Sequence, residues 1–358
     1  MRPDPPPPHP DRGQPAPPSA PVGITMGCPV GIGPEIILKY LHSTAAKPAA
    51  PPVIIGDAAV LAATGTALGL SLPLHLWHPG EPTVPDRLNL LGVSHLDPTT
   101  LIPGRPTQET GTAMAVAIDT GISLCLAGHL AALVTCPISK AALNLAGYRF
   151  PGHTEMLAAR TGAKQVAMML AGDRLRVVLA TIHCPFREVA SLLNQPALVD
   201  LVRLTDRALR TDFGLRAPRI GVAGLNPHGG EDAMFGREEI DIIAPAVQQC
   251  RELGLDISGP HPPDTIFYQA AAGRFDVVVC MYHDQGLIPF KLLHFADGVN
   301  VTLGLPIVRT SVDHGTAYDI AGRGSADFRS LQSAVTCAVR CAANRHGGNR
   351  SGTEPTQL

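Results

Sequence analysis

The sequence lacks an excess of charge of either sign. Its 28 lysines and arginines and 30 aspartates and glutamates give a formal net charge of -2. Proteins that bind nucleic-acid backbones carry clustered cations, and no such stripe is present. The chain also lacks the run of about 18 apolar residues that a membrane-spanning helix needs, and its first residues lack the apolar core of a signal peptide. We therefore expect a cytoplasmic protein with neither nucleic acid nor a membrane as partner.

The eight cysteines are scattered along the chain and include no CxxC pair. Several lie in apolar runs such as VVVCMY, where a reduced cysteine packs as a small hydrophobic side chain. This usage favours a reducing compartment. No internal repeat is visible either.

Neither a GxGxxG pattern nor a Walker lysine pattern is present, so the sequence gives no support for an ordinary Rossmann or P-loop site. The segment GCPVGIGPE, residues 27–35, nevertheless follows a predicted strand and enters a predicted helix. Backbone amides approach phosphates closely in that setting. A tight packing turn explains the same glycines, and the residues alone leave both interpretations open.

What the sequence does contain is an alternation of short apolar runs and helical patterns. Residues 1–21 are proline-rich and predict a disordered extension, and residues 346–358 predict a flexible tail. Between them, apolar runs such as 22–27 and 52–57 are each followed by a helical pattern. This order predicts an α/β fold with mostly parallel sheets, in two lobes. Pro34 in the first turn of one helix and Gly254 after the end of another fit these boundaries.

Three histidines follow predicted strands: His183, His228 and His283. In open α/β sheets the ligand site lies at the carboxyl ends of the strands, so these imidazoles could meet there. Three histidines with an open fourth position suit Zn²⁺ or a similar divalent ion that polarises an alcohol or carbonyl oxygen. Each one alone is explained as well by a strand-end hydrogen bond; the repeated placement favours the metal. The pattern does not separate a dehydrogenase from a metal hydrolase or an aldolase.

Further polar side chains lie in segments dense in small residues. Lys291, Asn300 and Arg309 are donors of the kind that a phosphate or carboxylate needs, although Arg309 alone could form a surface ion pair. His153 and Thr154 begin a predicted helix, where they either contact an anion or simply cap the helix. Asp264 lies in a proline-flanked loop, and by itself is best explained as a helix cap.

Seven segments in order resemble the signature segments of the 4-hydroxythreonine-4-phosphate dehydrogenase family. They are GCPVGIGPE, TCPISKAAL, GHTEMLA, GLNPHGGEDAMFGREEID, GPHPPDT, MYHDQGL and GVNVTLGLPIVRTSVDHGTAYDIAGRG. The resemblance covers nearly all of residues 22–344. One departure is Cys28, where the family usually has an aspartate, so any role of that carboxylate would be lost here.

The resemblance implies a role for each candidate residue. His183, His228 and His283 would bind one divalent metal ion (Zn, Mg or Co), with His283 contributed across the interface of a homodimer. The substrate-binding residues would be His153, Thr154, Lys291, Asn300 and Arg309. Asp264 matches an acidic residue of the active site, and either Asp264 or Lys291 would be the catalytic base.

The same resemblance implies the two-lobed fold of isocitrate and isopropylmalate dehydrogenases, with NAD or NADP in a cleft between the lobes. The expected lobes are residues 22–145 with 305–345, and residues 146–304, the latter with the metal site and the dimer interface. The fold would explain the missing GxGxxG pattern.

The implied reaction oxidises 4-phosphohydroxy-L-threonine to 2-amino-3-oxo-4-phosphooxybutanoate, which decarboxylates to 3-amino-2-oxopropyl phosphate in vitamin B6 biosynthesis. The same motifs fit D-threonate or D-erythronate 4-phosphate, or an aromatic cis-dihydrodiol. Outside this chemistry, a metal hydrolase would keep the histidines without nicotinamide, and a phosphate acyltransferase would need no metal.

Overall fold

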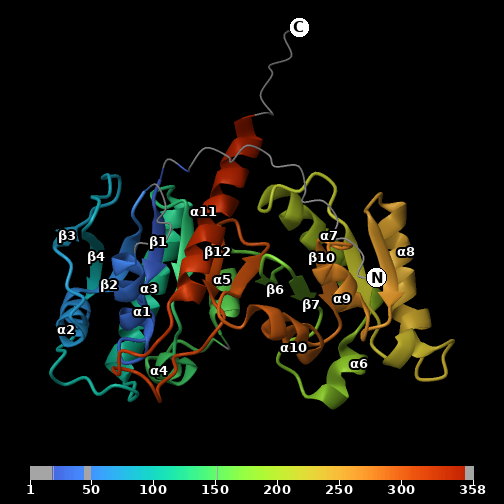
Figure 1. Ribbon diagram of the computed structural model, residues 1–358, viewed down its shortest axis with the longest axis horizontal. Coiled ribbons are helices and arrows are strands. Elements are labelled where there is room, and N and C mark those ends of the chain that lie inside the picture. Colours follow the sequence, from blue (N-terminus) through green and yellow to red (C-terminus); the bar gives the residue numbers. More distant parts are fainter. Residues whose placement is uncertain (1–17, 19, 44–49, 151, 351–358) are drawn as a thin grey trace, which may run out of the picture. The chain divides into compact units, whose positions relative to one another are not determined.

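The structure is a computed structural model that describes residue 18 and residues 20–43, 50–150 and 152–350 (Figure 1). Most of the expected N-terminal extension therefore lies outside the described residues, as do residues 351–358 of the expected tail. The described residues divide into two compact units. The first unit comprises those within 16–165 and 305–358, and the second unit those within 166–304. No helix in this part of the chain is long and apolar enough to cross a membrane.

The first unit contains a sheet of six parallel strands in the order β3-β4-β2-β1-β5-β12. The strands are β1 (Val22–Thr25), β2 (Val53–Asp57), β3 (Leu74–Leu76), β4 (Leu88–Ser94), β5 (Ala132–Thr135) and β12 (Arg309–Val312). The helices are α1 (Gly33–His42), α2 (Ala58–Leu68), α3 (Gln108–Leu126), α4 (Lys140–Leu145), α5 (His153–Thr161) and α11 (Arg329–Arg350). Every residue of β1, β2, β5 and β12 is buried, because helices cover both faces of this sheet.

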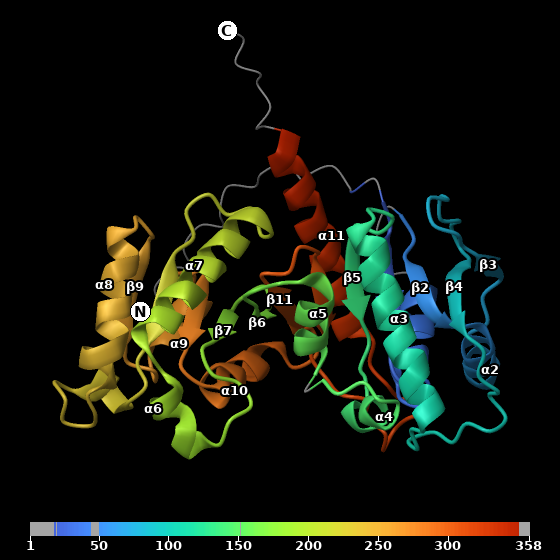
Figure 2. The same ribbon diagram turned by 180° about the vertical axis from the view of Figure 1, so that it is seen from behind.

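Figures 1 and 2 show α11 and α3 on opposite faces of the first unit's sheet. Local capping explains where its helices begin and end. The Asp57 carboxylate, for example, accepts hydrogen bonds from the backbone N–H groups of Ala59 and Val60 at the start of α2, and Gly69 ends that helix with a φ of 65°.

The second unit contains six strands in the order β11-β6-β7-β10-β8-β9. They are β6 (Ala167–Ala171), β7 (Arg176–Leu179), β8 (Ile220–Ala223), β9 (Ile257–His261), β10 (Val277–Cys280) and β11 (Val299–Leu303). Its helices are α6 (Val189–Leu192), α7 (Gln195–Thr211), α8 (Ala244–Glu252), α9 (Ile266–Ala271) and α10 (His283–His294), with a π-helical turn at Glu239–Ile243. The pairs β7–β10, β10–β8 and β8–β9 are parallel, whereas β6 pairs antiparallel with both β11 and β7.

The predicted α/β class with mostly parallel strands is confirmed, and Pro34 lies in the first turn of α1 as predicted. Two boundaries differ from the sequence-based ones. The division of the units falls after residue 165 and not after 145, because α5 packs on α3, where Arg160 and Asp119 form an ion pair of 2.9 Å. The chain was expected to be a flexible tail from residue 346 onwards, but it is helical as far as Arg350, because α11 continues through residues 347 and 348, which are both glycines.

Gly111 lies where α3 packs against α4. A Cβ at this position would lie 2.1 Å from the carbonyl oxygen of Ala142, whereas a Cβ at Gly92 would meet nothing within 4 Å. Gly111→Ala should therefore lower the free energy of unfolding by about 1–3 kcal/mol in chemical denaturation, despite the better helix propensity of alanine. Gly92→Ala, the matched control, should change it by no more than about 0.5 kcal/mol. Equal effects would contradict this packing.

Candidate functional site

The ends of β7 and β10 bring two of the predicted histidines together. Pairing continues past both strands: Ala180 N–H donates to Cys280 O at 2.8 Å, and the Thr181 hydroxyl donates to Met281 O at 2.8 Å. The strands end three or four residues before the histidines: His183 lies in the loop after β7, and His283 is the first residue of α10, which follows β10. Their ring centroids are 5.8 Å apart. This spacing allows both imidazoles to face one ion.

The residues after His283 fix its position. The Asp284 carboxylate lies 2.7 Å from His283 Nδ1, which leaves Nε2 as the nitrogen available to a cation. Gln285 is buried; its Oε1 accepts the N–H of Met281 and its Nε2 donates to Gly224 O, each at 2.7 Å. This side chain therefore ties the end of β10 to the end of β8.

His228 lies on the exposed turn after β8, and its ring is 6.3 Å from that of Phe235. Within residues 20–43, 50–150 and 152–350, no three His, Cys, Asp or Glu side chains are close enough together to hold a metal ion. One chain thus brings His183 and His283 together but does not add His228 to them. The resemblance had implied that His283 is the histidine from a second copy; here His283 stands beside His183 of its own chain.

The other candidates of the second unit lie on three elements. Asp264 is exposed in the turn before α9; the N-cap of that helix is Thr265, so Asp264 does not have the capping position. Lys291 is half-buried on α10, with Nζ 5.9 Å from the ring centroid of Phe295. Asn300 lies on β11, and its Oδ1 is buried with no hydrogen-bond partner among the described residues.

In the first unit, cationic and neutral donors gather around Arg309. This residue begins β12, is 2% exposed, and donates a hydrogen bond from its guanidinium to the Thr135 hydroxyl at 2.6 Å. Burial lowers the pKa of the guanidinium to about 9, so at neutral pH it remains a poorly solvated cation. An anionic ligand would compensate for the lost hydration.

His153 and Thr154 begin α5 in the same unit. Burial is the main cause that holds the pKa of His153 well below 6.5, and the positive charges of Arg309 and Lys140 add to it. The ring is therefore neutral at neutral pH. Its Nε2 is buried with no hydrogen-bond partner among the described residues. A neutral imidazole beside two cations can donate to, or accept from, a bound ligand without adding charge.

Lys140 was not among the sequence-based candidates, although it lies in one of the quoted segments. Its Nζ is 3.8 Å from the position that a Cβ on Gly152 would take, next to His153. Since α4 and α5 are distant from β12 in sequence, no spacing rule could have grouped Lys140 with Arg309. Gln285 was missed for a similar reason, because its partners Met281 and Gly224 follow two different strands, β10 and β8.

The glycine-rich start is a close-packed turn. Gly27 has a φ of 72°, and a Cβ on Gly33 would lie 2.1 Å from Met26 O. Cys28 is buried with its Sγ 3.4 Å from the Tyr318 hydroxyl, and burial raises the pKa of the thiol. At neutral pH Cys28 therefore carries no negative charge, whereas the aspartate that is usual at this position in the family would carry one.

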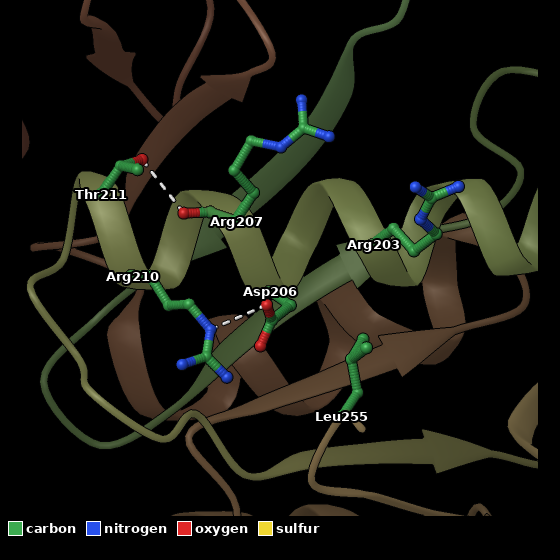
Figure 3. Close-up of a pocket in the computed structure, with 6 residues that line it drawn as sticks. All are labelled: Arg203, Asp206, Arg207, Arg210, Thr211 and Leu255. Carbon is green, nitrogen blue, oxygen red and sulfur yellow. Dashed lines mark hydrogen bonds and ion pairs between the residues drawn. The ribbon is translucent and has the colours of Figure 1, made fainter. Parts of the chain in front are cut away.

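A surface pocket of about 290 Å³ lies along α7 and contains none of the candidate residues. Figure 3 shows that the guanidinium groups of Arg203, Arg207 and Arg210 point in different directions around it. Asp206 lies 2.8 Å from Arg210 and offsets its charge. The arginines therefore do not converge on a common ligand.

A family model described as the pyridoxal phosphate biosynthetic protein PdxA matches residues 48–338 of this chain. A 4-hydroxythreonine-4-phosphate dehydrogenase from Desulforapulum autotrophicum is 53% identical over 92% of this chain and 97% of its own length. The crystal structure of a 4-hydroxythreonine-4-phosphate dehydrogenase from Klebsiella pneumoniae is 44% identical, with a TM-score of 0.83 over 91% of this chain and 98% of that one.

A terephthalate 1,2-cis-dihydrodiol dehydrogenase from Burkholderia xenovorans is also similar. It is 32% identical, with a TM-score of 0.62 over 90% of this chain and 98% of that one. These relatives are dehydrogenases, so the fold and the similarity define the chain as an α/β oxidoreductase. The chain belongs to the family of the pyridoxal phosphate biosynthetic protein PdxA. The hydrolase and acyltransferase alternatives have no support among these relatives.

The neutral state of His153 is testable by NMR titration of its ring protons. We expect the pKa of His153 to lie below 6.5 and to rise, still short of 6.5, in Lys140→Met, because a nearby positive charge is removed. Lys164→Met, which removes an exposed lysine of the same unit, should leave it unchanged.

The same shift has a consequence for stability. The unfolded chain takes up the proton near pH 6.5 and the folded chain does not, so this group lowers the free energy of unfolding as the pH falls below about 6.5. A His153 that titrates at or above 6.5 in the folded protein would contradict the proposed environment.

Proposed function

We propose that this oxidoreductase acts on the hydroxyl group of 4-phosphohydroxy-L-threonine, with NAD or NADP as oxidant and one divalent metal ion as cofactor. The product would be 2-amino-3-oxo-4-phosphooxybutanoate, which loses CO₂ to give 3-amino-2-oxopropyl phosphate. The observation that carries the choice of an anionic substrate is the buried guanidinium of Arg309, whose positive charge, like that of Lys140, acts on the neutral ring of His153. Relatives that are 53% and 44% identical bear the name of this reaction.

The first-unit side chains would hold the anionic part of the substrate. The Arg309 guanidinium offers several donors in a fixed plane, which suits the oxygens of a phosphate or carboxylate. The Thr154 hydroxyl and His153 Nε2 would add neutral hydrogen bonds. In the second unit, Lys291 and Asn300 carry the same kind of donors, and the buried Oδ1 of Asn300 also offers an acceptor. These residues would fix the substrate by hydrogen bonds and charge.

The histidines fit a divalent ion in their donor chemistry. The 5.8 Å separation of the His183 and His283 rings, and the carboxylate on His283 Nδ1, are features that metal-binding imidazoles share. His228 would supply the third nitrogen. A metal ion bound there would polarise the substrate oxygen and lower the pKa of the hydroxyl.

In the oxidation, the carbon that bears the hydroxyl gives up a hydride to the nicotinamide ring, and the hydroxyl proton goes to a base of the protein. The ketone then lies beta to the carboxylate, so the bond to that carboxylate can break with release of CO₂. The electron pair of this bond is taken up at the carbon, which is finally protonated. Lys291 and Asp264 are the two candidates for the proton transfers.

The metal set would be completed by a second copy of the chain. Since one chain brings together only His183 and His283, His228 of the partner subunit is the natural third ligand in a homodimer. Exposed apolar side chains support self-association: Ile288, Leu292 and Phe295 on α10 are 69%, 85% and 82% exposed. Their spacing places them on one face of the helix. A contiguous group of exposed apolar side chains of this kind is typical of a surface that binds another protein.

The substrate is tested by NAD(P) reduction with the purified, metal-loaded protein. We expect reduction with 4-phosphohydroxy-L-threonine that a chelator abolishes. Preference for D-threonate or D-erythronate 4-phosphate would keep the chemistry and overturn the B6-pathway substrate. Turnover of an aromatic cis-dihydrodiol alone, as in the name of the 32% identical relative, would overturn the choice of a phosphorylated hydroxy acid as substrate. Reduction that persists without metal would overturn the role of the histidines.

The dimer is tested by analytical ultracentrifugation. Leu292→Asp should shift the protein from dimer to monomer, because it puts a charge on the apolar face of α10, where Leu292 is 85% exposed. Leu145→Asp, a matched change at a 64% exposed leucine of the first unit, should leave the dimer intact. The assignment of the interface fails if the two variants sediment alike.

A further inference from the structure

The turn that carries His228 has an unfavourable backbone. Six consecutive residues, 228–233, have positive φ values of 52°, 70°, 84°, 43°, 52° and 73°. Only residues 229 and 230 among them are glycines. Side chains of L-residues crowd the backbone in this region, so such a run persists only where surrounding groups determine it. The cause of the conformation must therefore lie outside the turn.

The Glu239 carboxylate is the group that holds this turn. Its Oε1 accepts the backbone N–H groups of Leu225 and Asn226 at 2.7 and 2.8 Å, and its Oε2 accepts Asn226 Nδ2 at 2.9 Å. Asn226 Nδ2 also donates to Glu238 Oε2 at 2.7 Å. Glu239 is 3% exposed, so these charge-assisted bonds form away from water. Two successive N–H groups on one oxygen fix the direction in which the chain enters the turn.

The glycines of the turn show how closely the chain wraps around this carboxylate. A Cβ on Gly224 would lie 3.0 Å from Glu239 Oε1, and a Cβ on Gly230 would lie 2.7 Å from Oε2. A Cβ on Gly236 would lie 2.4 Å from Asn226 Nδ2. The backbone on both sides of His228 is thus in direct contact with Glu239 or with its hydrogen-bond partner.

Glu239 lies at the start of a helical segment. It begins the π-helical turn Glu239–Ile243, in which the N–H of Ala244 donates to Glu239 O, and α8 follows directly. Such wide turns inside helices are frequent at functional sites, where they place a side chain that a regular helix would direct elsewhere.

We propose that Glu239 is a positioning residue, which sets the His228 imidazole for metal binding while touching neither metal nor substrate itself. The inference deepens the proposed function, since it rests on His228 as a ligand. Groups that surround a metal-binding side chain hold it in one orientation before the ion binds. The buried Glu239 carboxylate would have this role for His228.

The test compares two isosteric changes, Glu239→Gln and Glu238→Gln, in the full-length protein. Both keep an acceptor oxygen and remove a charge. Glu239 accepts hydrogen bonds with both oxygens, so Glu239→Gln must turn an amide NH₂ toward the backbone donors or Asn226 Nδ2. Glu238 bonds Asn226 Nδ2 through Oε2, and the amide oxygen of Glu238→Gln can keep that bond. We expect its Co²⁺ dissociation constant to rise by about 10- to 100-fold, with a changed visible spectrum of the bound ion. Amides of residues 225–236 should exchange hydrogen faster in the metal-free protein. Glu238→Gln should show much smaller changes in each measurement.

Asn226→Ala removes the Nδ2 bonds without altering a charge and should also raise the Co²⁺ dissociation constant. It replaces Glu239→Gln in the test if that variant does not fold. Glu239→Gln and Asn226→Ala should each unfold within a few degrees of the thermal midpoint of the wild type. A general loss of structure would lower that midpoint further. Unchanged amide exchange and Co²⁺ affinity in Glu239→Gln would overturn the positioning role. Unchanged Co²⁺ binding in His228→Ala would instead overturn the metal site.

Discussion

The backbone pairing between the ends of β7 and β10 is the constraint on which the site of the second unit depends. Ala180 and Thr181 donate hydrogen bonds to Cys280, the last residue of β10, and to Met281, which follows it. These bonds extend the parallel register beyond β7 and so place His183 and His283 side by side. Gln285 then links β10 to β8, the strand that leads into the His228 turn. These bonds connect the sheet to the segments that carry His183 and His283, so the sheet determines where the two imidazoles lie.

The first unit contains a buried cationic side chain, which is the basis of the anion-binding role proposed for it. An arginine that is 2% exposed lies at the start of β12, held by the Thr135 hydroxyl of the neighbouring strand. Burial is unfavourable for a cation in the free protein, and the pKa of His153 is lowered so that it does not add a further charge. A site that is poorly hydrated and positive favours anions of fixed shape over water, which is the selectivity that a phosphorylated acid requires.

Much of this was accessible from the sequence. Alternating apolar runs and helical patterns predicted the α/β class, and α2 follows the apolar run 52–57 as predicted, with Asp57 at its start and Gly69 at its end. The pairing of His183 with His283 followed from the rule that parallel strands end at one edge. The role of Glu239 could not be predicted, since it depends on a π-helical turn and on six positive φ values that no local residue preference requires. Lys140 and Gln285 depend on contacts between distant segments. The metal-binding, substrate-binding and catalytic roles of all the site residues, and the likeness to the isocitrate dehydrogenase fold, stay predictions.

The central claim is that His183 and His283 of one chain share an ion with His228 of the partner subunit. It is tested most directly by mixing two inactive variants, His183→Ala and His228→Ala, under conditions that exchange subunits. In a mixed dimer one site would carry both substitutions and the other neither, so the account predicts that metal-dependent activity returns, with one intact site in each mixed dimer. If all three ligands came from a single chain, every site would lack one histidine. A mixture that stays inactive, although mixed dimers are shown to form, would contradict the account.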